Sequence, residues 1–432
     1  MKNKIRKIIC VLLCLVCAVI TCSCEKTTVN SEHEKTEIVI WTWDDTFNVK
    51  AAKMAADQYM CTHPGIKITV ETKEREEILS KTKLMLSSKV YGNLPDVVMI
   101  EDYDIQDVLQ SYEKEFVKLT DLVDYDQYVD YKKQLCEKNG EYYGIPFDCG
   151  VAALFYRLDI LQAAGYEEAD MQNLTWSEFI EIGKNVQEKT GVPMLTLDPT
   201  DLPLIRIMMQ SCGKWYVSLD GKTADIEEND VLREALDIYT RLLRSNIGVS
   251  VNGWNEFIQS FQEGQVASVI SGGWIMSSIK VAESQEGLWR VAPIPAMDDS
   301  GTTPAASNVG GSSWYVLKNS PQSKLATEFM VEMFAENDSF VNSLVEAIGI
   351  IPTIKDSAKL PAYDEEDAFF GGQQVTKLLT EWAEIIPTVN YGSKTYEIEA
   401  ILEAELQDAL QGDEWELCMI HTQQKAEVVT RE

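Results

Sequence analysis

Apolar runs and amphipathic segments alternate along the chain from residue 38 to residue 100. The continuous apolar runs predict buried strands, and apolar positions spaced three or four residues apart predict helices. Strands are predicted at 38–43, 66–70 and 96–100, with one helix ending near Cys61 and another at 76–88. This strand, helix, strand order predicts a parallel sheet with helices on both faces, which is an α/β fold.

A polar interruption separates two apolar runs near the middle of the chain. Phe147-Asp148-Cys149-Gly150 lies between a strand-like run that reaches Pro146 and the run Val151 to Tyr156. We therefore predict two buried strands joined by a short extended link, as a crossing between two lobes requires. A similar extended crossing is predicted at 349–353.

Helices and short strands continue in the second half. Thr175-Trp176-Ser177-Glu178 fits a capping box, in which the first and last residues satisfy each other's backbone N–H groups at a helix start. Further helices are predicted at 178–189, 230–244 and 395–410, and strands at 267–270 and 289–294. The strand at 267–270 leads into Ser271-Gly272-Gly273-Trp274, where glycine allows a close approach to the backbone.

The first 23 residues are typical of an export signal. Four cationic side chains precede an apolar core at 8–20, which is too short to span a bilayer of about 30 Å as a helix. The following Thr21-Cys22-Ser23-Cys24 resembles the lipobox of bacterial lipoproteins, with Cys24 as the expected lipidated residue and Cys22 as the alternative. The polar residues of 24–35 predict a flexible tether.

Length and charge narrow the class of protein. With 432 residues the chain suits two lobes or domains better than one core. Its formal net charge of −31 would become −35 without the signal segment. Such an excess of carboxylates repels nucleic acid and favours neutral or cationic ligands, although acidity also simply keeps an exported protein soluble.

Cysteine and histidine usage argues against metal or cofactor chemistry. Half of the ten cysteines lie in the first 24 residues, and the remaining five form no CxxC motif or disulfide framework. No two of the three histidines have metal-ligand spacing, so neither a metal nor a cofactor is expected. GxSxG, HExxH and P-loop patterns are missing from the sequence, and no pair of carboxylates stands out as a glycosidase pair.

Several segments, in this order and spacing behind an export signal, resemble the extracellular solute-binding proteins of ABC sugar importers. They include LPDVVMIEDYD, YYGIPFDCGVAALFYRLDIL and FQEGQVASVISGGW, which begin at Leu94, Tyr142 and Phe261. TWSEFIEIGK, SNVGGSSWYVLKNS and GIIPT, beginning at Thr175, Ser307 and Gly349, add to the pattern. The segment from Phe369 to Tyr391 is most similar to members that bind short oligosaccharides.

The resemblance implies a type II periplasmic-binding-protein fold, in which two α/β lobes surround a cleft and three hinge crossings join them. Carried onto this chain, the crossings fall near 145–150, 307–310 and 349–352. Lobe 1 would comprise 36–146 with 309–349, and lobe 2 would comprise 147–308 with 350–432.

A sugar presents hydroxyl groups and an apolar ring face, so its binder needs carboxylates or amides together with aromatic plates. Each candidate also has a structural alternative, such as core packing for Trp43, helix capping for Asp102 and solvation of the hinge for Asp148. Trp274 matches the family's stacking tryptophan, whereas Gly310 and Gly311 form at least a turn. The expected ligand contacts are Trp43, Asp44, Asp102, Asp148, Trp274, Gly310, Gly311, Trp382 and Tyr391.

The expected function is capture of a sugar or short oligosaccharide by a non-enzymatic, monomeric lipoprotein on the outer face of the bacterial cytoplasmic membrane. The protein would close around the sugar and deliver it to ABC permease subunits. Two alternatives stay open: a sugar sensor for a membrane kinase, and a secreted carbohydrate-active hydrolase.

Overall fold

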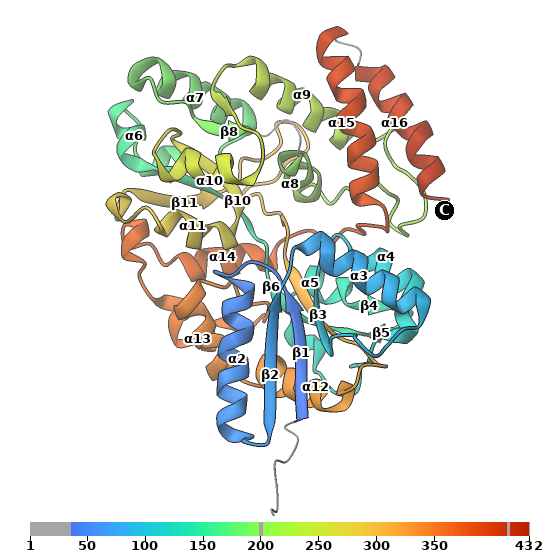
Figure 1. Cartoon of the computed structure of the whole chain (residues 1–432). Coiled ribbons are helices and arrows are strands. Elements are labelled where there is room, and N and C mark those ends of the chain that lie inside the picture. Colours follow the sequence, from blue (N-terminus) through green and yellow to red (C-terminus); the bar gives the residue numbers. More distant parts are fainter. Residues whose placement is uncertain (1–35, 198–201, 413–414, 432) are drawn as a thin grey trace, which may run out of the picture.

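A computed structural model describes residues 36–197, 202–412 and 415–431 of the chain. The predicted signal segment, the expected lipidation residue Cys24 and the predicted tether lie outside the described residues. Two separate sheets organise the rest, one in the lower and one in the upper half of the molecule as drawn in Figure 1. We call the part built on the larger sheet lobe 1 and the part built on the smaller sheet lobe 2.

The sheet of lobe 1 has five strands in the order β2-β1-β3-β12-β6. As predicted, the first three strands are parallel, because the helices between them carry the chain back to the same edge. Strand β12 runs antiparallel to β3 and β6. The strands are β1 (Thr36–Thr42), β2 (Ile66–Thr72), β3 (Val97–Glu101), β6 (Gly144–Asp148) and β12 (Ser312–Val316).

Helices cover the sheet of lobe 1, and their buried faces join its core. The π-helical turn Val331–Ala335 continues the last turn of α12. A small two-stranded hairpin, β4 (Glu137–Lys138) with β5 (Glu141–Tyr142), precedes β6. The helices are α2 (Asn48–Thr62), α3 (Arg75–Ser88), α4 (Ile105–Tyr112), α5 (Asp130–Leu135), α12 (Ser323–Met330) and α13 (Asp338–Ile348).

The sheet of lobe 2 is antiparallel, with β7 (Ala152–Arg157) between β10 (Ser268–Gly272) and β11 (Trp289–Pro293). Short strands β8 (Leu195–Leu197) and β9 (Gly248–Ser250) pair in parallel beside it. The surrounding helices are α6 (Leu158–Ala163), α7 (Trp176–Thr190), α8 (Pro203–Ser211), α9 (Asp230–Arg244), α10 (Trp254–Gln262) and α11 (Met276–Lys280). The predicted capping box of α7 is confirmed, since Thr175 accepts from the Glu178 backbone N–H and Glu178 accepts from that of Thr175.

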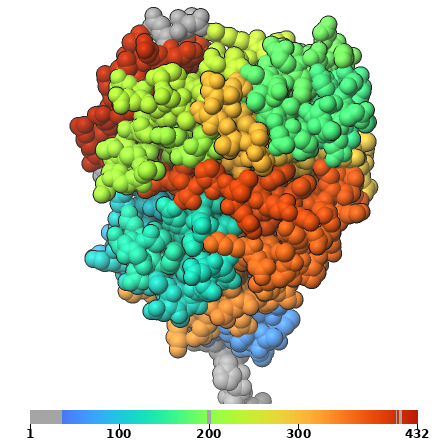
Figure 2. All heavy atoms as spheres, turned by 180° about the vertical axis from the view of Figure 1, so that it is seen from behind, coloured from blue at the N-terminus to red at the C-terminus, as the bar shows by residue number. Residues whose placement is uncertain are grey.

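The C-terminal part of the chain adds α14 (Val375–Glu384), α15 (Thr395–Gly412) and α16 (Trp415–Val429). Helices α15 and α16 pack against each other on the lobe 2 side, and α15 points toward lobe 1 (Figure 1). Seen from behind, the orange-to-red part of the chain runs across the middle of the molecule, between the two halves (Figure 2). Among the described residues, no helix combines the length and apolar character needed to cross a membrane.

The three predicted crossings lie beside one another between the sheets. The backbone N–H of Cys149 donates to the carbonyl of Ile351 (3.1 Å), and that of Val309 donates to the carbonyl of Gly150 (2.7 Å). Thr353 also bonds through its hydroxyl to the Pro146 carbonyl (3.3 Å). The predicted division into 36–146 with 309–349 and 147–308 with 350–432 stays a proposal, and Phe147 and Asp148 belong with lobe 1 by sheet membership, because both lie in β6.

Candidate functional site

A cleft of about 930 Å³ lies between the two lobes and takes its lining from both. Lobe 1 contributes residues that follow the carboxyl ends of β1, β2 and β3, which share one edge of the sheet because the strands are parallel. Lobe 2 contributes residues of α8 and α10 and the segment after β10. A volume of this size suits a small organic ligand.

On the lobe 1 side, Trp43 and Asp44 line the cleft directly after β1. The indole of Trp43 is partly exposed, and the Asp44 side chain is exposed. Asp44 has a positive φ of 61°. Its Oδ1 accepts from the Thr46 backbone N–H (3.0 Å) and hydroxyl (2.7 Å), which orients the carboxylate at the cleft edge just before α2.

On the lobe 2 side, three aromatic rings face the cleft. Trp274 follows β10, and its indole N–H donates to the Val309 carbonyl (3.0 Å), which fixes the ring plane. Trp254 and Phe257 from α10 join it, with ring centroids of Trp254 and Trp274 5.6 Å apart and those of Trp254 and Phe257 also 5.6 Å apart. Trp254 is 54% exposed, so with Phe257 and Trp274 it presents an aromatic face to the cleft.

Trp254 and Phe257 are missing from the sequence-based site. A signal was present, since the two aromatic residues are three positions apart in the first turn of a helix that begins after Gly253. That spacing places both on one helix face, but only the fold brings this face beside Trp274.

The base of the cleft is formed by Asp148 and the turn before β12. Asp148 Oδ1 accepts from both the backbone N–H (2.8 Å) and the hydroxyl (2.7 Å) of Ser312. Burial raises the pKa of Asp148, against the opposing effects of Lys132 and Ser312. Gly310 and Gly311 have φ angles of 70° and 89°, so the left-handed turn that carries the backbone along the cleft requires glycine at both positions.

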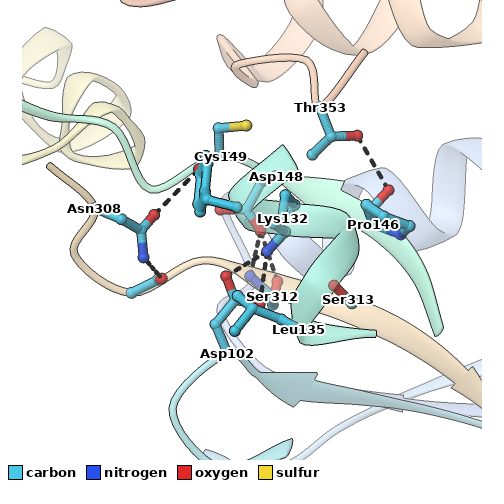
Figure 3. Close-up of polar contacts among 12 residues, drawn as sticks. Asp102, Lys132, Leu135, Pro146, Asp148, Cys149, Asn308, Ser312, Ser313 and Thr353 are labelled. Carbon is cyan, nitrogen blue, oxygen red and sulfur yellow. Dashed lines mark hydrogen bonds and ion pairs between the residues drawn. The ribbon is translucent and has the colours of Figure 1, made fainter. Parts of the chain in front are cut away.

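Asp102 lies beneath the cleft and does not contribute to its lining. Both of its carboxylate oxygens accept from the buried ammonium group of Lys132, at 2.6 and 2.5 Å (Figure 3). Burial raises the pKa of Asp102 to about 7, and Lys132 offsets only part of this effect. Burial alone would lower the pKa of Lys132, but Asp102 and Asp148 outweigh it and raise that pKa. Asp102 therefore supports the site from below, and we leave it out of the proposed ligand contacts.

Two further expected contacts are packed elsewhere. Trp382 on α14 is 8% exposed and belongs to the core of lobe 2. Tyr391 is fully buried, with its hydroxyl donating to Gln210 Oε1 (2.9 Å) and accepting from Asn308 Nδ2 (3.1 Å). Because these groups are already paired or packed away from the cleft, we leave both out of the proposed site.

A charged and aromatic side of the cleft was also missed from the sequence. Arg75 and Glu101 from lobe 1 and Arg206 and Tyr396 from lobe 2 all line it. Arg75 Nη1 bonds to Glu101 (2.6 Å), and Tyr396 donates its hydroxyl to the same carboxylate (2.6 Å). Glu101 and Tyr396 are 295 residues apart in the sequence, so local patterns could not bring them together.

The described part of the chain contains no group of three His, Cys, Asp or Glu side chains that could hold a metal ion. The cleft instead combines aromatic faces with carboxylates, hydroxyls and backbone groups. This chemistry fits a neutral ligand that has an apolar face and many hydroxyl groups.

The chain is similar in sequence to known solute-binding proteins. A profile described as "Bacterial extracellular solute-binding protein" matches residues 54–371. A lactose-binding protein of Rhizobium radiobacter is 40% identical over 376 residues, covering 87% of this chain and 89% of the relative. An arabinooligosaccharide-binding protein of Halalkalibacterium halodurans is 27% identical, covering 83% and 81% of the two chains.

Solved structures share the fold at lower identity. The GacH receptor of Streptomyces glaucescens superposes with a TM-score of 0.77 at 18% identity, over 92% of this chain and 99% of its own. An ABC transporter associated binding protein from B. animalis subsp. lactis, solved with β-1,6-galactobiose, has a TM-score of 0.74 at 22% identity, over 92% and 98%. The type II periplasmic-binding fold predicted from the sequence is therefore confirmed.

Proposed function

We propose, starting from the fact that this chain belongs to the bacterial extracellular solute-binding protein family, that it captures a sugar or short oligosaccharide in the interlobe cleft. The observation that carries this proposal is that side chains from both lobes, aromatic rings and a carboxylate among them, line the same cleft. Trp254, Phe257 and Trp274 offer aromatic faces from lobe 2, and Trp43 and Asp44 face them from lobe 1. Stacking would hold the ring of the sugar.

The polar groups of the cleft would orient the stacked sugar. Asp44 and Asp148 can accept hydrogen bonds from sugar hydroxyls, and each such bond to a charged group contributes roughly 1.5 to 3 kcal/mol. The glycine turn at 310–311 brings backbone groups to the same place without a side chain in between. We propose Trp43, Asp44, Asp148, Trp254, Phe257, Trp274, Gly310 and Gly311 as the ligand contacts.

For the ligand itself, we propose a disaccharide with a β-linked galactose, and lactose as the first candidate. Support comes from the relative named as a lactose-binding protein and from the similar fold solved with β-1,6-galactobiose. The relatives are named as binding proteins, so we favour capture over hydrolysis.

Delivery would follow closure of the lobes. A ligand that contacts both walls stabilises the closed form, which the permease subunits of an ABC importer would recognise. We further propose that the protein is a monomer, exported and held at the outer face of the cytoplasmic membrane by a lipid on Cys24.

A thermal-shift screen against mono- and oligosaccharides, lactose included, tests this proposal. A ligand that binds only the folded state raises the melting temperature, because saturation at 100 times Kd adds about 2.7 kcal/mol to the free energy of unfolding. We expect a clear rise with lactose. Analysis of the same samples for products distinguishes binding from turnover: failure of every sugar to shift the melting temperature refutes capture, and cleavage of lactose argues for a hydrolase.

A further inference from the structure

The two lobes touch each other on one side of the cleft. The hydroxyl of Tyr396, on α15 of lobe 2, donates to Glu101 Oε2 at the end of β3 in lobe 1, over 2.6 Å. Both residues line the cleft, so at this point the opposing walls are in direct contact. Burial raises the pKa of Tyr396 well above its usual range, which keeps the hydroxyl protonated and able to donate.

Positive charges from both lobes hold the Tyr396 ring in place. The guanidinium carbon of Arg75, from lobe 1, lies 5.0 Å from the ring centroid, and that of Arg206, from lobe 2, lies 5.7 Å away. Each arginine is itself fixed: Arg75 by Glu101 and Asp104, at 2.6 and 2.7 Å, and Arg206 by an ion pair with Glu399 on α15. Two cations near one ring stabilise its position from both sides of the boundary.

A packed aromatic contact lies next to this hydrogen bond. Tyr103, which follows β3 in lobe 1, is only 2% exposed because its ring packs against lobe 2. It stacks on Trp215 with centroids 5.5 Å apart and an interplanar angle of 23°, and it meets Tyr391 edge-on at 4.7 Å. The contact between the lobes on this side is thus a continuous interface, and the Tyr396–Glu101 bond forms its cleft-facing border.

We propose that Tyr396 and Glu101 form a gate that closes this side of the cleft and thereby excludes sugar chains that extend past Tyr396. The inference rests on the proposed function, which it narrows to short ligands. A sugar unit cannot pass between two side chains whose oxygens are 2.6 Å apart. A longer sugar chain could enter only if the Tyr396–Glu101 hydrogen bond and the arginine contacts of the Tyr396 ring were lost. This cost would lower the affinity for longer chains relative to short ones.

Amide hydrogen exchange on the ligand-free protein tests whether the gate is closed. Tyr396→Phe keeps the ring and removes only the hydroxyl, so exchange is expected to accelerate together in peptides covering 97–104 and 395–402, one from each lobe. Tyr91→Phe is the matched control, since Tyr91 donates to Glu115 (3.0 Å) within lobe 1. It should leave the lobe 2 peptide unchanged. Unchanged exchange of both peptides in Tyr396→Phe would overturn the gate.

Calorimetry with lactose and with a trisaccharide that extends lactose by one β-galactose tests the effect on length. We expect the wild-type protein to prefer lactose, and Tyr396→Ala to reduce that preference about tenfold. An equal preference in both proteins would refute exclusion by length, even if exchange showed a closed gate. If neither protein bound any sugar, the proposed function would fail, whereas the exchange experiment would still decide whether the gate is closed.

Discussion

Trp274 and Trp382 show that the surroundings of a residue decide its role. Both are candidate ligand contacts in the sequence, Trp274 after a predicted strand end and Trp382 on a predicted helix. In the structure Trp274 lines the cleft with its N–H held by Val309, whereas Trp382 packs into the core of lobe 2. The two tryptophans should therefore respond to substitution in opposite ways.

Trp274→Ala is expected to weaken lactose binding by roughly 2 kcal/mol, the scale of an aromatic anchor in a binding site. Isothermal titration calorimetry measures this loss. Trp382→Phe serves as the control, because it should lower the free energy of unfolding through imperfect core packing and leave the affinity unchanged. Equal affinity of Trp274→Ala and the wild-type protein would exclude Trp274 from the site.

Asp102 gives a prediction for the dependence of stability on pH. An unfolded aspartate loses its proton near pH 4, whereas burial, together with the nearby Asp148 and Glu101 and against the effect of Lys132, raises the pKa of Asp102 to about 7. Between these values the native state binds the extra proton, so the contribution of Asp102 to the free energy of unfolding falls as pH rises. Below about pH 4 this contribution is fully present, and above about pH 7 it is lost.

Urea unfolding of the wild-type protein and of Asp102→Asn, at pH 5 and pH 7.5, measures that contribution. The wild-type protein should lose roughly 2 kcal/mol relative to the variant over this range. Asparagine can still accept a hydrogen bond from Lys132 but does not titrate, which makes it the appropriate reference. Parallel pH profiles for the two proteins would show that Asp102 is ionised throughout.

At the scale of elements, the turn that enters β12 joins the cleft to the buried charges below it. Gly311 has φ 89°, and a Cβ added there would lie 2.7 Å from Asp102 Oδ2 and 3.2 Å from Lys132 Nζ. This turn can therefore carry the backbone past the ion pair only if residue 311 has no side chain.

Gly311→Ala should lower the free energy of unfolding by roughly 2 to 4 kcal/mol, because it combines backbone strain with displacement of a buried ion pair. Gly140→Ala isolates the strain, since Gly140 has a similar φ of 80° but no atom within 4 Å of the added Cβ. That control should lose only about 1 to 2 kcal/mol. Denaturant unfolding of both variants checks the difference, and equal losses would mean that the ion pair tolerates the methyl group.

Elements could be predicted from the sequence where their signals are local. The capping box at Thr175 and the first three parallel strands are examples, since hydrophobic period and capping residues act within a few positions. Trp43 and Trp274, which were predicted from their positions at strand ends, both line the cleft. Pairing across the chain was not predictable: Lys132 is 30 residues from Asp102, and Gln210 is 181 residues from Tyr391. Such partners decide whether a polar side chain faces a ligand or the protein.

At the scale of the whole molecule, the three crossings and the proposed Tyr396–Glu101 gate would both act on closure of the lobes. The crossings lie side by side and leave rotation of the lobes as the simplest movement, while the gate already restrains one side. Ligand binding would then close mainly the side of the cleft away from α15.

Small-angle scattering with and without saturating lactose tests this movement. The radius of gyration should decrease on binding in the wild-type protein, and it should decrease by more in Tyr396→Phe, whose ligand-free form starts less closed. Tyr91→Phe should behave like the wild-type protein. An unchanged radius in all three proteins, with binding confirmed by calorimetry, would rule out closure.

The exposed ring of Trp254 also gives the protein a built-in optical reporter. Trp41, Trp176, Trp215, Trp289, Trp314 and Trp382 are all buried, so their emission should change little when a ligand arrives. Three tryptophans line the cleft, namely Trp43, Trp254 and Trp274. A bound sugar would displace water from their rings, so their fluorescence would shift to shorter wavelength. Lactose titration followed at this wavelength should reach half of its full change at the calorimetric Kd, and Trp254→Phe should remove a large part of the shift. Sugar capture would thus be readable in unlabelled protein, at concentrations far below those that scattering requires.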